Sequence, residues 1–312
     1  MRTAKPTNKR FTFSLLWQNL CPLLVGCTLL IPAAYCWARQ AGHGTTQGQS
    51  PDLVEALKRD STGVDDGDVK LLFDLKRVAD THDLQAVPVL EEIFDQRRSH
   101  TLSVRALQSK LPSASSHGES RFETEWLKLE DELHIASVLI KLGVKDDVYW
   151  NYLAEQVQAI VRINIPFPFK TDAQEGPNPS TSPEFTAWVK SRNLDQNEAA
   201  IYQLTKMPIP VLLLATMDDP RGIPLLRQGL KSANPIIQMA SADGLAQLHD
   251  NESVPLIIAT CKKVSVSERN KLAESLLYFD DPQAQAYAAL NLPKETYISI
   301  RRRIAQGHTP FN

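Results

Sequence analysis

Histidine and cysteine are the residue types through which this chain would most readily bind a metal or attack a substrate. The seven histidines are His43, His82, His100, His117, His134, His249 and His308. No two are separated by three or four residues, the spacing that brings two ligands onto one helix face. The chain also lacks a phosphate-binding loop, a Gly-x-Ser-x-Gly turn and a Cys-x-x-Cys pair. We therefore predict no metal ion, no cofactor and no catalytic residue.

The four cysteines are distributed unevenly along the chain. Cys21, Cys27 and Cys36 fall in an apolar leader, and only Cys261 lies in the body. A body with one thiol cannot form an internal disulfide, whatever the redox state of its compartment. Cys261 follows Val254 at helical spacing, which favours a small buried hydrophobic residue over a nucleophile.

A ligand site, if there is one, is expected among aromatic residues in the middle of the chain. The candidates are Trp126, Tyr149, Trp150, Phe167, Phe169 and Trp188. The alternative for Phe167 and Phe169 is that they fold back over a neighbouring edge of the core. His134 and His249 lie on predicted helices or at their ends, where we expect surface or capping roles rather than catalysis.

The charge balance argues against a polyanionic partner. The chain has 34 basic and 36 acidic residues, a formal net charge of −2. Four of the bases and none of the acids lie in residues 1–38, so the body has an excess of acids. We therefore expect a protein partner, and neither nucleic acid nor an anionic membrane surface.

Residues 1–38 have the composition of a secretory signal or a membrane anchor. A basic head precedes residues 11–38, which contain no charged side chain. Three alternatives remain open: cleavage after Ala38, retention as a membrane anchor, and lipidation at Leu24–Cys27. The basic head stays on the cytoplasmic side in all three, so we predict an exported, periplasmic or extracellular body. Membrane contact would then be confined to residues 11–38, if they are not cleaved.

The body is expected to begin after a flexible linker at residues 39–50. Residues 51–162 carry apolar stripes at helical spacing and predict degenerate helical repeats. Residues 163–182 form a proline-rich aromatic insertion that cannot continue a helix. Residues 183–312 predict clearer helical repeats that end in a capping helix.

The clearest pattern in the chain has a period of 31 residues. Asp219, Asp250 and Asp281 follow this step, and so do Pro224 and Pro255. Proline is tolerated in the first turn of a helix, and aspartate there can accept hydrogen bonds from unpaired backbone amides. The period therefore predicts helix pairs that stack on one another, each with an aspartate cap and a proline in its first turn.

The segment Asp218–Leu226, followed by Ala240, Ala242 and Leu245, resembles the HEAT repeat in the short form first described in phycobilisome lyases. The likeness covers residues 211–289 well and residues 69–161 less closely. It departs from the family at Glu268-Arg269, where the repeat usually has Val-Arg. The resemblance implies an all-α fold, an α-solenoid of helical hairpins, and in most members of the family protein–protein interaction.

Two functions follow as hypotheses. The first is a non-enzymatic scaffold for a protein partner, because the sequence combines stacked repeats with no recognisable catalytic spacing. The second is a lyase-like enzyme or a ligand carrier, with a site on the concave face near the aromatic insertion.

Overall fold

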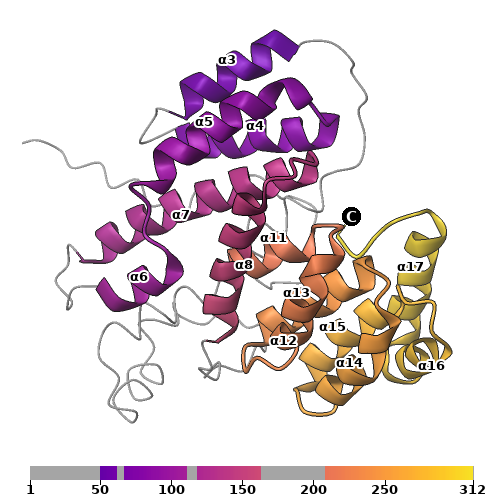
Figure 1. The fold of residues 1–312 in the computed structure, drawn as a ribbon. Helices are drawn as coiled ribbons and strands as arrows, with labels where there is room; N and C mark the ends of the chain where they lie inside the picture. The colour runs from indigo at the N-terminus through magenta and orange to yellow at the C-terminus, as the bar shows by residue number, and fades with distance from the viewer. Residues whose placement is uncertain (1–49, 62–66, 111–117, 163–207, 312) are drawn as a thin grey trace, which may run out of the picture.

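The computed structural model describes residues 50–61, 67–110, 118–162 and 208–311 (Figure 1). Over these ranges the chain forms thirteen α-helices and three short 3-10 helices, and no strand. The predicted all-α class is therefore confirmed. No helix in the same ranges is both long enough and apolar enough to cross a bilayer.

Several predicted segments lie outside the described residues. They are the leader at 1–38, the linker at 39–50 except for its last residue, and the insertion at 163–182. The first part of the predicted C-terminal repeats, up to residue 207, lies outside them as well.

The N-terminal part of the structure is organised around one long helix. Its helices are α3 (Ser50–Asp60), α4 (Gly67–Thr81), α5 (Val87–Arg98), α6 (Val104–Lys110), α7 (Gly118–Lys141) and α8 (Asp147–Val161), with η1 (Leu84–Ala86) before α5. The long helix α7 packs against α4, α5 and α8, and also against α11 from the C-terminal part. Figure 1 shows α7 crossing below α3, α4 and α5. It therefore joins the two parts of the molecule.

The C-terminal part has two alternating sets of helices. They are α11 (Ile209–Ala215), α12 (Ile223–Gly229), α13 (Pro235–Gln247), α14 (Val254–Cys261), α15 (Val266–Leu276), α16 (Pro282–Asn291) and α17 (Lys294–Ala305). The 3-10 turns η3 (Pro220–Gly222) and η4 (Asn251–Ser253) precede α12 and α14. Helices α11, α13 and α15 pack in that order, while α12 packs on α13 and α14 on α15 (Figure 1).

The periodic aspartates occupy equivalent places but do not all make the predicted contact. Asp219 and Asp281 accept backbone amide hydrogen bonds at the starts of η3 and α16, as predicted. The side chain of Asp250 accepts no hydrogen bond from the backbone amides of η4, so the predicted cap is wrong at this position. Its two carboxylate oxygens instead accept hydrogen bonds from Arg227 at 2.9 and 2.6 Å, and it also accepts one from the Ser253 hydroxyl. Asp250 thus ties α12 to η4, the turn before α14.

The close packing of α13 against α11 depends on a glycine. Pro224 and Pro255 lie in the first turns of α12 and α14, as the period predicts. A β-carbon added at Gly244 of α13 would lie 2.8 Å from the Cα of Ala215 in α11, closer than atoms of that kind can approach. Gly244 therefore allows these two helix backbones to touch.

The buried apolar residues form two clusters. The N-terminal core lies among α3, α4, α5, α7 and the start of α8, and the larger C-terminal core runs from α6 to α17. Ile140 and Tyr152 pack against both. Cys261 is fully buried in the C-terminal core, and burial raises the pKa of its thiol to about 11. The interpretation of Cys261 as a small hydrophobic residue is therefore confirmed.

Candidate functional site

The structure describes three of the six aromatic residues predicted to form a ligand site. Tyr149 is buried in the N-terminal core, where its ring meets that of Phe94 edge-on with 5.0 Å between centroids. Trp126 and Trp150 are half-buried at the edge of the C-terminal core. The structure thus separates Tyr149 from the two tryptophans. The remaining three candidates, Phe167, Phe169 and Trp188, lie outside the described residues.

Trp150 makes a contact that joins two parts of the chain. The guanidinium carbon of Arg221 lies 4.4 Å from the centroid of its ring, within the range of a cation–π interaction. Arg221 also pairs with Asp219 at 2.7 Å and with Asp147 at 3.4 Å. One face of the indole is therefore covered by an arginine from η3, and this contact connects α8 to the turn before α12.

Helix α7 brings several ionisable side chains into the interior. Asp131, Glu132 and His134 are buried, and Glu130 is nearly so. Asp131 forms an ion pair with Arg97 of α5, whose guanidinium also donates a hydrogen bond to the backbone oxygen of Ser61 at 3.0 Å. This pair ties α5 and the end of α3 to the central helix.

Glu132 faces α8 from a fully buried position. Its Oε2 accepts a hydrogen bond of 2.6 Å from the hydroxyl of Tyr152. Burial raises the pKa of Glu132, and burial together with the Glu132 charge raises the pKa of Tyr152. If the Tyr152 hydroxyl were removed, Oε2 of buried Glu132 would lose the hydrogen bond that it accepts from α8. Because losing a buried hydrogen bond is costly, this contact helps hold α7 against α8.

Glu130 and His134 form a second buried pair, one turn apart on α7. Glu130 Oε1 lies 3.9 Å from His134 Nε2. Burial raises the pKa of Glu130 to about 7, whereas burial and the charge of Lys141 lower the pKa of His134 to about 3. The pKa of Lys141 is itself lowered by burial, and its ammonium donates to the hydroxyl of Thr216 at 3.2 Å. At neutral pH, Glu130 is therefore the group of this set that exchanges a proton most readily.

The raised pKa of Glu130 makes this carboxyl the candidate proton-exchanging group of α7. Trp126, Glu130 and His134 follow one another at intervals of four residues and so lie along one side of the helix. Within the described ranges, no three His, Cys, Asp or Glu side chains are grouped as a metal ion would require.

Sequence reasoning did not find these residues. The prediction of a surface or capping role is wrong for His134, which is 2% exposed, whereas His249 is exposed and has the positive φ of 50° common at helix ends. A usable signal was present. Residues 133–140 of α7 are apolar except for His134 and Ser137, and a helical segment that is apolar all round is buried together with its polar residues, here His134.

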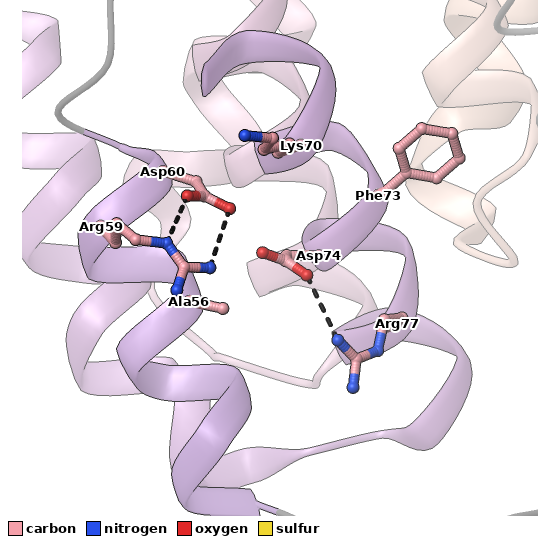
Figure 2. Close-up of a pocket in the computed structure, with 7 residues that line it drawn as sticks. All are labelled: Ala56, Arg59, Asp60, Lys70, Phe73, Asp74 and Arg77. Carbon is pink, nitrogen blue, oxygen red and sulfur yellow. Dashed lines mark hydrogen bonds and ion pairs between the residues drawn. The ribbon is translucent and has the colours of Figure 1, made fainter. Parts of the chain in front are cut away.

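A candidate binding site lies in the N-terminal part of the structure, in a groove between α3 and α4 (Figure 2). The groove has a volume of about 310 Å³. It is lined by Ala56, Arg59, Asp60, Lys70, Phe73, Asp74 and Arg77, and we call it the α3–α4 groove. Five of these seven residues are ionisable, and none was a predicted site residue.

Comparison with known proteins finds no matching family model, no matching curated protein and no matching solved structure.

Proposed function

We propose that the chain is an exported or membrane-anchored scaffold of HEAT-like repeats that binds a protein partner without catalysing a reaction. The observation that carries this proposal is that residues 31 positions apart in the sequence lie at the same position in alternate helices. Pro224 and Pro255 occupy the same first-turn position in α12 and α14, and Asp219 and Asp281, two periods apart, cap η3 and α16. Repeats of this kind present extended surfaces that typically bind other proteins.

The order of helix packing supports a solenoid. In such an array each helix pair shields the apolar side of the next, so contacts run between neighbours in the sequence. Helices α11, α13 and α15 pack in order, and α12, α14 and α16 flank them. The Arg227–Asp250 ion pair, at 2.6 Å, joins one repeat to the following turn. Contacts of this kind would make the C-terminal part a continuous support for a partner.

Export is supported by the composition of the leader. Four bases precede the uncharged stretch at residues 11–38, an arrangement that directs the following chain across a membrane. Fractionation of cells that express the full chain with a C-terminal tag tests this part. We expect the tag in the envelope or outside the cell, and recovery in the cytoplasm would overturn the proposed location.

The binding function is tested by isolating the tagged full chain from its own envelope after chemical cross-linking. We expect one second protein to be recovered repeatedly in constant proportion to the chain. Recovery of the chain alone, together with turnover of a small molecule by the purified protein, would overturn the scaffold and favour an enzyme.

One observation favours the second candidate, an enzyme or a ligand carrier. Trp126, an aromatic candidate from the sequence, lies one turn before Glu130 on α7, and burial raises the pKa of that carboxyl to about 7. Carboxyls with raised pKa values serve as general acids in many enzymes. Reduced turnover in Glu130→Gln, with an unchanged fold, would support this alternative once a reaction had been found.

A further inference from the structure

The α3–α4 groove has two acidic side chains on its floor, and each is paired with an arginine. Asp60 and Asp74 are each 7% exposed. Arg59 donates two hydrogen bonds to Asp60, at 2.9 and 3.4 Å, and Arg77 donates one to Asp74 at 3.4 Å. Figure 2 shows both carboxyls pointing into the space between the two helices.

The two carboxyls titrate differently because their surroundings differ. The hydrogen bond from Arg59 lowers the pKa of Asp60, so this group is ionised at neutral pH. Burial, and then the charge of Asp60, raise the pKa of Asp74. Each acid pairs with an arginine of the groove, so the two acids offset two of the three bases and the lining keeps an excess of one base.

The rim of the groove is basic and aromatic. The side chains of Arg59 and Arg77 are 72% and 59% exposed, and Lys70 is exposed as well. Phe73 is 58% exposed, and Figure 2 shows its ring apart from the two carboxyls. Lys70, Phe73 and Arg77 lie at positions i, i+3 and i+7 of α4, which places them on one side of that helix.

These residue types are the ones that dominate protein interfaces. Arginine and aromatic side chains contribute most of the binding energy at protein–protein contacts when an occupant covers them. A large exposed aromatic ring on the first described hairpin also differs from the polar outer face expected of a terminal repeat. The three bases outnumber the two acids of the groove, in a protein whose formal net charge is −2. The local sign is thus opposite to that of the whole chain.

We propose that the α3–α4 groove docks an acidic segment of the protein partner, with carboxylates against Lys70, Arg59 and Arg77 and an apolar side chain against Phe73. This inference rests on the proposed scaffold function and names the surface and the chemistry of the partner. The carboxylates bind at the rim, because Asp60 and Asp74 repel them from the floor.

A polypeptide fits this surface better than the other polyanions. A nucleic acid or a lipid surface is bound by many positive charges spread over a wide area, whereas the groove offers three bases within one small lining. A peptide can place its carboxylates selectively and still offer an apolar side chain to Phe73 and Ala56.

The test uses the purified full chain and a short fluorescent peptide of glutamates around one leucine. Binding is followed by fluorescence anisotropy, with a lysine peptide of the same design, a single-stranded oligonucleotide and anionic phosphatidylglycerol vesicles as competing probes. We expect saturable binding of the glutamate peptide that weakens with salt. No binding of this peptide, or equal or tighter binding of any other probe, would overturn the inference.

Two substitutions locate the binding. We expect Phe73→Ala and Lys70→Glu each to weaken binding of the glutamate peptide by roughly tenfold. Leu84→Ala is the matched control for the first, since Leu84 is 57% exposed and does not line the groove. Lys231→Glu, at an exposed position of the C-terminal part, is the control for the second. Equal weakening in the controls would overturn the groove as the site.

The same variants separate this inference from the proposed function. If the wild-type chain and the variants Phe73→Ala and Lys70→Glu recover the same partner equally, the groove is not the docking site, but the scaffold function is supported. No partner for the wild-type chain would refute the scaffold itself. Loss of the partner in the two variants, but not in the controls, supports both.

Discussion

Replacing Glu130 with glutamine should stabilise the protein, and more so as the pH rises. Glutamine keeps the shape of the side chain but removes the charge that burial disfavours. Burial raises the pKa of Glu130 from 4.5 to about 7. Each pKa unit corresponds to about 1.4 kcal/mol, so the ionised carboxyl costs the folded state about 3 kcal/mol above pH 7.

The sign of the pH dependence follows from the direction of the shift. An acid whose pKa is raised on folding binds its proton more tightly in the folded state. The contribution of Glu130 is therefore most favourable below pH 4.5 and is lost between pH 4.5 and about 7. Glu130→Gln should exceed the wild type in free energy of unfolding by less than about 1 kcal/mol at pH 4.5 and by about 3 kcal/mol at pH 8.

Urea unfolding of the wild type and Glu130→Gln at both pH values measures this difference. Comparing the two proteins at each pH cancels the opposite contribution of His134, whose pKa is lowered to about 3. Glu125→Gln on the same helix is the matched control. Its partner Lys128 is partly exposed, so we expect a change within about 1 kcal/mol at both pH values.

A Glu130→Gln variant that is no more stable than the wild type at pH 8 would refute the reasoning. An equal gain in the free energy of unfolding at the two pH values would also refute it. Removing a buried charge must stabilise the protein more at the pH where the carboxyl is more ionised.

Three further predictions concern contacts that hold the helices together. Gly244→Ala should lower the free energy of unfolding by about 1–3 kcal/mol in urea titrations, because the added methyl group meets the backbone of α11. Tyr152→Phe should cost about 1–3 kcal/mol at pH 7 in the same assay, since buried Glu132 loses its hydrogen bond; an unchanged midpoint would contradict the contact. Asp281→Ala should cost about 1 kcal/mol by thermal unfolding and increase amide exchange in the first turn of α16, and unchanged exchange there would refute the cap.

Much of the fold could be predicted because local signals agreed with one another. The 31-residue period correctly predicted that Pro224 and Pro255 lie in the first turns of helices. Helical spacing correctly predicted that the apolar face containing Cys261 is buried. Asp250 departed from its periodic role because Arg227, 23 residues earlier, reaches its carboxylate. Local propensity does not predict contacts of that sequence separation.

The candidate site was harder to predict than the fold. His134 was predicted to have a surface or capping role, and Glu130 was not among the predicted site residues. Their burial results from the packing of α4, α5, α8 and α11 around α7, which no short sequence window contains. The α3–α4 groove is likewise a tertiary feature, since Arg59 and Arg77 approach one cavity from two helices.

The most direct test of the central claim is cross-linking mass spectrometry on the full chain in the cells that produce it, with the wild type and Phe73→Ala compared. We predict cross-links between the wild-type chain and a single second protein in constant proportion, with the cross-links nearest α3 and α4 lost in the variant. A chain that forms no cross-link to another protein, and that instead converts a small molecule when purified, would contradict the account.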